Sequence, residues 1–276
     1  VFVCAPLAGL LLLARPSTAR EWGWLAGAAL WTALWLQPLG GLDTQVARAA
    51  AVFLCGSFLG LTLWRPSPLF SRALVAAAAA GASLVVWMLH LGISWSQVRQ
   101  AVNHDLTAYQ DAARVQWEAA GVPSDLVAEL TAISGTVAKL FPALLLIAAV
   151  AGLRLAWAWY HRVSARPLGA PPPPFAAFRF NDQFVWGWVV ALGLRLFPTP
   201  DPWPAVGSNL LLLWTALSAT RGLAVLVAGA GQVPRSLIVV LGVISMFMMP
   251  FVVGGLILLG LADTWLDFRR RMSPAT

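Results

Sequence analysis

Long apolar runs, each bounded by a short segment with arginine, proline or glycine, dominate this sequence. An α-helix needs about 20 apolar residues to cross the hydrocarbon core of a bilayer. Six runs approach or exceed that length: Trp22–Leu39, Ala47–Trp64, Leu74–Ile93, Leu140–Tyr160, Ala205–Ala230 and Ser236–Ala262. Because lipid offers the backbone no hydrogen-bond partners, such runs cross a membrane as helices. The sequence therefore predicts an all-α fold, a polytopic bundle of transmembrane helices with six strong spans.

The composition excludes an ordinary soluble enzyme. Hydrophobic residues make up 59% of the 276 residues and charged residues only 11%, whereas a soluble domain is about half apolar and a quarter charged. In a soluble domain the net charge of +7 would indicate nucleic acid. Here the basic residues lie between apolar runs, where they orient and anchor helices. We expect the lipid bilayer as a partner and no nucleic acid.

The two cysteines give no sign of metal chemistry. Cys4 and Cys55 both lie in apolar runs and lack the spacing of a zinc site or a disulfide framework. We therefore expect buried, inert thiols, with no metal and no cofactor.

Two shorter apolar runs, Val1–Ala14 and Phe184–Phe197, leave the number of crossings open. If all eight runs cross, one side of the membrane carries Arg15, Arg20, Arg65, Arg72, Arg162, Arg166, Arg179 and Arg235. The positive-inside rule makes that side cytoplasmic. The arginines of residues 269–271 would then lie outside. The conflict disappears if one short run after residue 162 does not cross, and Phe184–Phe197 is our candidate for a re-entrant or tilted segment.

Residues 94–135 interrupt the apolar character of the chain. Apolar residues recur there every three or four positions, the period of an amphipathic helix: Val98, Val102, Leu106, Tyr109, Ala113, Trp117 and Ala120. Gly121 ends this pattern, and Pro123 suits the first position of a new helix. We interpret the segment as an amphipathic helical hairpin inserted between spans. It either covers the bundle or acts as a lid or partner-docking element.

Residues 163–181 form the best candidate for a connector. The run Pro171–Pro174 has no amide hydrogens to donate and favours an extended, polyproline-like chain. We expect one integral membrane domain, residues 1–276, with the helical insertion and this connector inside it.

Several motifs of the second half occur in an order and spacing that resemble a known family. They are Leu140-Phe141-Pro142-Ala143-Leu144, Pro173-Pro174-Phe175, Phe178-Arg179, Gly207-Ser208-Asn209-Leu210-Leu211, Arg221-Gly222-Leu223-Ala224-Val225 and, as the most specific, Gly260-Leu261-Ala262-Asp263-Thr264-Trp265-Leu266-Asp267-Phe268-Arg269. The chain resembles the YybS-like family of bacterial integral membrane proteins, chiefly from Ser94 to Arg271. The resemblance implies a multi-pass protein of the bacterial inner membrane.

That family is in turn distantly similar to the substrate-binding subunits of energy-coupling-factor vitamin transporters. Those subunits bind a vitamin and dock on a shared transmembrane subunit through small residues spaced by four. Ala29 and Ala33 have this spacing, as do Gly23 and Gly27, and small residues let two helices approach closely. The resemblance thus implies other membrane subunits and a small organic solute as partners. Ordinary packing within the bundle explains the same small residues.

No catalytic or ATP-binding motif occurs in the sequence, so we expect neither an enzyme nor an ATPase. Polar residues at membrane depth are costly unless they face a cavity or a partner. The candidate substrate-binding residues are Asn209, Arg221 and His90, and the candidate partner-docking residues are Ala29, Ala33, Asp263, Trp265 and Asp267.

Other interpretations of these polar residues stay open. His90 and Arg221 also lie where they reach the membrane interface. Otherwise Arg221 faces inward, toward an acidic group of a substrate or toward Asp263 or Asp267. Asp267 and Arg271 have the spacing of an i, i+4 ion pair.

Two functions are consistent with these observations. The first is a solute-binding, transport-related membrane subunit that borrows its energy from a partner. The second is a structural or accessory subunit of a larger bacterial membrane complex.

Overall fold

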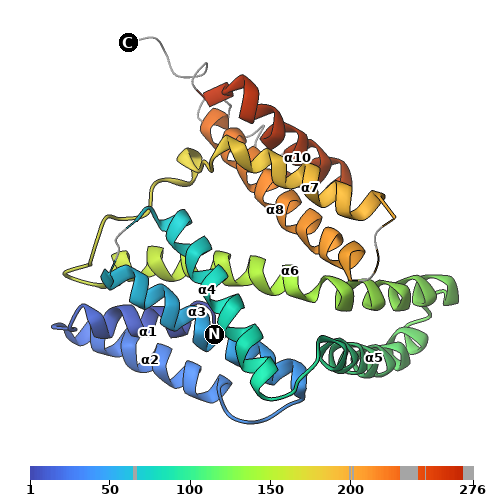
Figure 1. The fold of residues 1–276 in the computed structure, drawn as a ribbon, viewed down its shortest axis with the longest axis horizontal. Helices are drawn as coiled ribbons and strands as arrows, with labels where there is room; N and C mark the ends of the chain where they lie inside the picture. Colours follow the sequence, from blue (N-terminus) through green and yellow to red (C-terminus); the bar gives the residue numbers. More distant parts are fainter. Residues whose placement is uncertain (65–66, 199, 201, 231–241, 246, 270–276) are drawn as a thin grey trace. The chain divides into compact units, whose positions relative to one another are not determined.

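The chain forms two compact units, Val1–Pro172 and Pro173–Thr276 (Figure 1). The computed structural model describes residues 1–64, 67–198, 200, 202–230, 242–245 and 247–269. Every regular element within these residues is a helix, in agreement with the predicted fold class. The boundary between the units falls inside the proline run of the predicted connector. The interpretation of residues 1–276 as one integral membrane domain stays a prediction.

The first unit is built around a short N-terminal helix. It contains α1 Cys4–Leu13, α2 Ala19–Trp35, α3 Leu42–Trp64, α4 Leu69–His90, α5 Trp95–Ala119 and α6 Ser124–Val163. α1 packs against α2, α3 and α6, and Leu7, Leu10 and Leu11 are at most 1% exposed. Ten residues of helix extend only about 15 Å, half of the hydrocarbon thickness of about 30 Å. Within the given sequence, the run Val1–Ala14 is therefore a core element of this unit.

The predicted hairpin is present as two helices joined by a turn, but its second arm is longer than expected. Ser94 begins α5 with a capping box, in which Gln97 N–H donates to the Ser94 side chain and Ser94 N–H donates to the Gln97 side chain. Gly121, with φ +72°, adopts the left-handed conformation that the turn requires. α6 then runs unbroken for 40 residues. The expected insertion 94–135 thus ends inside a helix.

Five helices among the described residues are long and apolar enough to cross a membrane, one fewer than the six predicted. They are Leu42–Trp64, Leu69–His90, Gly135–Val163 of α6, Trp203–Gly229 and Met249–Leu266. The predicted span Trp22–Leu39 is not among them because α2 ends at Trp35, shortly before Pro38, and begins with Arg20 and Glu21. The start of the predicted span Ser236–Ala262 lies largely outside the described residues.

The second unit contains η1 Phe175–Ala177, η2 Asp182–Phe184, α7 Val185–Leu196, α8 Trp203–Gly229 and α10 Met249–Leu266. α8 packs against both α7 and α10. The run Phe184–Phe197 forms α7, whose 12 residues extend only about 18 Å. This length agrees with a segment that does not cross by itself.

Candidate functional site

The most elaborate polar cluster of the second unit joins α8 to α10. Arg221 donates from Nε to Asp263 Oδ2 over 2.8 Å and from Nη2 to the Asp263 carbonyl over 3.1 Å. Both side chains are 0% exposed. A buried charge is tolerated when it is paired and hydrogen-bonded, and here two groups of one residue satisfy the guanidinium. Of the alternatives for Arg221, the structure shows the inward one.

Asp263 accepts hydrogen bonds from two further groups of the C-terminal segment. Arg269 donates from Nη2 to Oδ2 over 2.8 Å, and the Phe268 N–H donates to Oδ1 over 3.2 Å. Arg269 also donates from Nη1 to the carbonyls of Ala176 and Phe178. One carboxylate therefore holds α8, the end of α10 and the segment around η1 together.

The outer part of the cluster is half exposed and balances its charge. Arg221 donates from Nη1 to Asp182 Oδ1 over 2.8 Å, and Arg179 donates to Asp267 Oδ1 over 2.7 Å. The Phe180 ring lies beneath the Arg221 guanidinium, with its centroid 5.1 Å away. The three arginines of the network (Arg179, Arg221 and Arg269) face three aspartates (Asp182, Asp263 and Asp267). We call these six residues the ion network.

Two glycines let α8 and α10 approach closely enough to form the buried pair. A β-carbon at Gly222 would meet the Leu256 carbonyl, and one at Gly260 would meet the Ser218 carbonyl. Small residues permit such backbone contact between membrane helices. Each glycine is next to, or one turn from, its charged neighbour in sequence. The close crossing therefore brings Arg221 within reach of Asp263.

Of the other predicted residues of this unit, Asp267 belongs to the ion network, whereas Asn209 and Trp265 are not among its six members. Asn209 donates to the Ala205 carbonyl over 2.9 Å, and it lies 12 residues before Arg221, about 18 Å along α8. Trp265 is 69% exposed and points away from the packed interior. Asp267 ends α10 in the left-handed conformation and pairs with Arg179. The alternative partner of Asp267, Arg271, lies outside the described residues. The assigned binding roles stay predictions.

In the first unit a buried carboxylate closes the end of the helical bundle. Glu21 is 2% exposed. Its Oε2 accepts from the N–H groups of Ser17 and Thr18, and its Oε1 accepts from Ala165 N–H over 2.8 Å and Ser164 Oγ over 3.2 Å. The backbone hydrogen bonds from Ala165, Ser17 and Thr18 lower the pKa of Glu21 to about 2. Glu21 thus ties the start of α2 to the end of α6.

A buried arginine of the first unit is held by aromatic rings. The Arg72 guanidinium lies 4.2 Å from the centroid of Trp157 and 5.1 Å from that of Phe58. Only 4% of Arg72 is exposed, and its Nε has no hydrogen-bond partner. Ring faces attract cations. The position of Arg72 in the sequence suggests an orienting charge between helices, but the structure places this side chain in the core.

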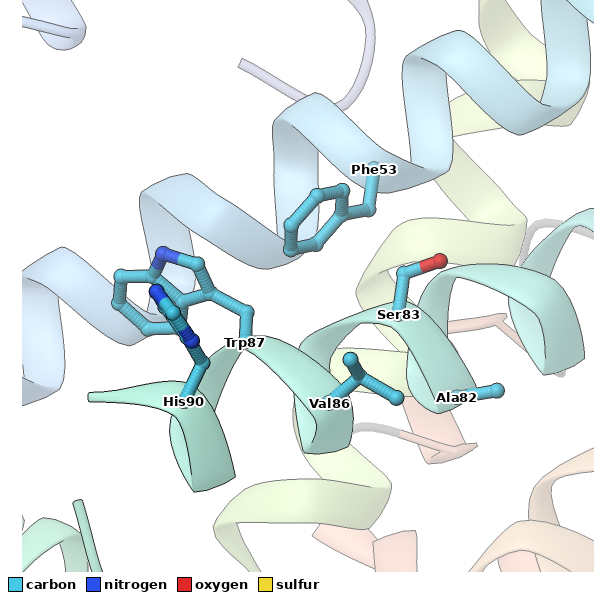
Figure 2. A pocket seen from close by; sticks show the side chains of 6 residues that line it. All are labelled: Phe53, Ala82, Ser83, Val86, Trp87 and His90. Carbon is cyan, nitrogen blue, oxygen red and sulfur yellow. The ribbon is translucent and has the colours of Figure 1, made fainter. Parts of the chain in front are cut away.

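The third predicted substrate residue, His90, lies at one end of an open groove between α3 and α4. Figure 2 shows Phe53 projecting from α3 over the α4 side chains, with the His90 and Trp87 rings side by side. Ala82, Ser83 and Val86 complete the lining of this open groove, whose volume is about 500 Å³. The groove is mostly apolar, with polar groups only at Ser83, Trp87 and His90.

The small residues of α2 face outward. Glu21, Leu25 and Ala28 mark the buried face of this helix. Ala29 and Ala33 are exposed beside that face. Gly23 and Gly27 lie on the side opposite to it, and no atom lies within 4 Å of a β-carbon built at either glycine. Packing among the described residues of the first unit therefore does not account for these four residues, and their docking role stays a prediction.

Some residues with structural roles are recognisable from their sequence spacing, and others are not. Thr18 and Glu21 have the spacing of a capping box, which the structure contains. Asp182 and Ser164 carry no such signal, because their partners lie far away in the sequence. Among the described residues, no group of three His, Cys, Asp or Glu side chains is arranged to hold a metal ion.

One protein family matches nearly the whole chain. The family is described as "Predicted membrane protein (DUF2232)", and the match covers residues 1–264. It includes the N-terminal part, where the resemblance noted from the sequence is weaker. The name YybS-like and the similarity to energy-coupling-factor subunits are not part of this match. No curated protein and no solved structure matches the chain.

Proposed function

This chain belongs to the DUF2232 family of predicted membrane proteins, and we propose that it is a non-enzymatic subunit of a larger bacterial inner-membrane assembly. The uncovered small-residue face of α2 carries this proposal. Ala29 and Ala33 lie one turn apart on an exposed side of α2, where the backbone of a second helix fits closely. Gly23 and Gly27 form a second exposed pair, about 120° around the same helix. A helix that faced only lipid would gain nothing from small residues.

The ion network also supports the accessory role, because its contacts lie within residues 173–276, the second unit of this chain. Arg221 and Asp263 satisfy one another inside that unit, so their charges are neutralised without a ligand. This favours the accessory role over a solute site built on Arg221.

Site-specific crosslinking in native membranes tests the docking face. A photo-reactive residue at Ala26, which is exposed on the same side of α2 as Ala29 and Ala33, is expected to give an adduct with a second polypeptide. Ala29→Leu with Ala33→Leu is expected to abolish that adduct. The matched control carries the photo-reactive residue at Ala79, which is exposed on α4. Adducts with lipid alone, or equal protein adducts from both positions, would contradict the proposal. An adduct of twice the chain mass identifies the second copy as the partner.

The groove at His90 favours a second candidate, a solute-binding subunit of a transporter without its own ATPase. A concave, mostly apolar site with a few polar groups is typical of small-molecule binding. A thermal-shift screen of vitamins and metabolites on purified protein is the test. A hit that disappears in His90→Ala but persists in His104→Ala, an exposed histidine of α5, supports this candidate. A screen without hits removes it.

A further inference from the structure

Four exposed arginines meet at one end of the first unit. Arg15 follows α1, Arg20 lies in the first turn of α2, Arg162 lies in the last turn of α6, and Arg166 follows it. Figure 1 shows the end of α1, the start of α2 and the end of α6 at the same end of this unit. The Arg20 guanidinium also donates to the Arg162 carbonyl over 3.4 Å. We call this set the basic end.

The basic end forms no ion pair with the part of the protein that the structure describes. Among the described residues, no acidic side chain forms an ion pair with any of these four arginines. The nearest buried carboxylate in the sequence, Glu21, is occupied by hydrogen bonds from the backbone and from hydroxyl groups. Those bonds fix the α1–α2 turn against the end of α6. The arginines are therefore presented on a scaffold that is already ordered.

An aromatic pair lies on the same two helices. The rings of Trp24 and Trp159 are tilted against each other with centroids 5.2 Å apart. Trp24 follows Arg20 by about one turn, and Trp159 precedes Arg162 by three residues. Tryptophan is enriched at the level of the lipid headgroups. A tryptophan pair beside the basic end is therefore typical of a segment at the depth of the membrane phosphate groups.

We propose that the basic end binds the headgroup of an anionic phospholipid. Guanidinium groups form charge-assisted, bidentate hydrogen bonds with phosphate oxygens. The excess positive charge favours a lipid with net negative charge over a zwitterionic one. The bound lipid would bridge the α1–α2 turn and the end of α6, the two segments that Glu21 joins.

Lipid retention by the full chain tests this proposal. Protein in mixed micelles with phosphatidylglycerol and phosphatidylcholine is expected to retain phosphatidylglycerol preferentially in native mass spectrometry. Arg20→Gln with Arg162→Gln is expected to reduce that preference. The expected reduction is roughly fivefold for each arginine removed, because the attraction of one arginine to an anionic surface corresponds to about that factor. The control is Arg114→Gln with Arg195→Gln, two exposed arginines elsewhere, which should keep the preference.

Three outcomes overturn the proposal. They are equal retention of both lipids by the unchanged protein, an unchanged preference in the Arg20 and Arg162 variant, and loss of the lipid on addition of inorganic phosphate alone. A variant that fails to fold also loses lipid. Each variant is therefore compared with the unchanged protein by circular dichroism and by its retention of phosphatidylcholine. Neither readout should change if the arginines act only on the headgroup.

Discussion

Asp263 Oδ2 lies 2.8 Å from Nε of Arg221, and neither side chain has any exposed surface. The pair spans 42 residues of sequence and joins two helices that are each long enough to cross a membrane. A buried pair contributes little compared with an apolar replacement, but breaking it leaves an uncompensated charge. The two partners differ in their second ion pairs. The side chain of Arg269, the second partner of Asp263, is 12% exposed, whereas that of Asp182, the second partner of Arg221, is 59% exposed. Asp263 therefore has the better shielded second partner.

Asp263→Ala is expected to destabilise the protein strongly. It removes the one fully buried acceptor of Arg221 and also a partner of Arg269, and removal of one member of a buried pair typically costs about 3–5 kcal/mol. Arg221→Met should cost less, because Asp263 keeps Arg269. The measurement is the free energy of unfolding by denaturant in mixed micelles. A larger loss of unfolding free energy in Arg221→Met than in Asp263→Ala would contradict this prediction.

Combining the two replacements gives a second, independent test. Arg221→Met with Asp263→Leu replaces both charges by apolar groups and is expected to recover part of the stability lost in Asp263→Ala. Strictly additive losses in a double-mutant cycle would show that the two side chains are not coupled.

The glycines at the α8–α10 crossing predict opposite effects for chemically identical changes. Gly260→Ala places a methyl group on the Ser218 carbonyl, and backbone cannot move aside as a side chain does. We expect a loss of about 1–3 kcal/mol from overpacking. Gly254→Ala on the same helix meets nothing within 4 Å and should gain about 0.5–1 kcal/mol from helix propensity. Equal unfolding free energies for the two variants would refute the close crossing.

The all-α class and most of the spans could be predicted from the sequence, because both depend on the local run of apolar residues. It missed the end of α2, where Pro38 and Gly40 stop the helix before the apolar run ends. It also could not choose a partner for Arg221, since Asp263 and Asp267 lie one turn apart near the end of α10. The folded chain decides this by the close α8–α10 crossing, which depends on Gly222 and Gly260.

The outer ion pairs were less predictable still. Arg179 and Asp267 are 88 residues apart, and Asp182 reaches Arg221 only because the segment after the proline run folds back on α8. Periodicity carries no information on such contacts. Glu21 is a different case, because its capping-box spacing was readable while its bond to Ala165, 144 residues away, was not.

The pKa of Glu21 predicts acid sensitivity of the first unit. The Glu21 carboxyl group has a pKa of 4.5 in the unfolded chain and of about 2 in the folded protein. Its stabilising effect is therefore complete above pH 4.5 and is lost as the pH falls through 2. Glu21→Gln should lower the melting temperature at neutral pH and flatten its decline between pH 4.5 and pH 2. A parallel decline in both proteins would assign the acid sensitivity to other groups.

The two ends of α6 predict the orientation of the first unit. If the basic end is cytoplasmic, as the positive-inside rule requires, the opposite end of α6 lies on the other side, because residues 135–163 are long and apolar enough to cross. In a background with Cys4→Ala and Cys55→Ala, Ser124→Cys should react with a membrane-impermeant maleimide in spheroplasts. Arg166→Cys should react only after the membrane is opened. Labelling of both positions in closed spheroplasts would mean that α6 does not cross, and the reverse pattern would invert the orientation.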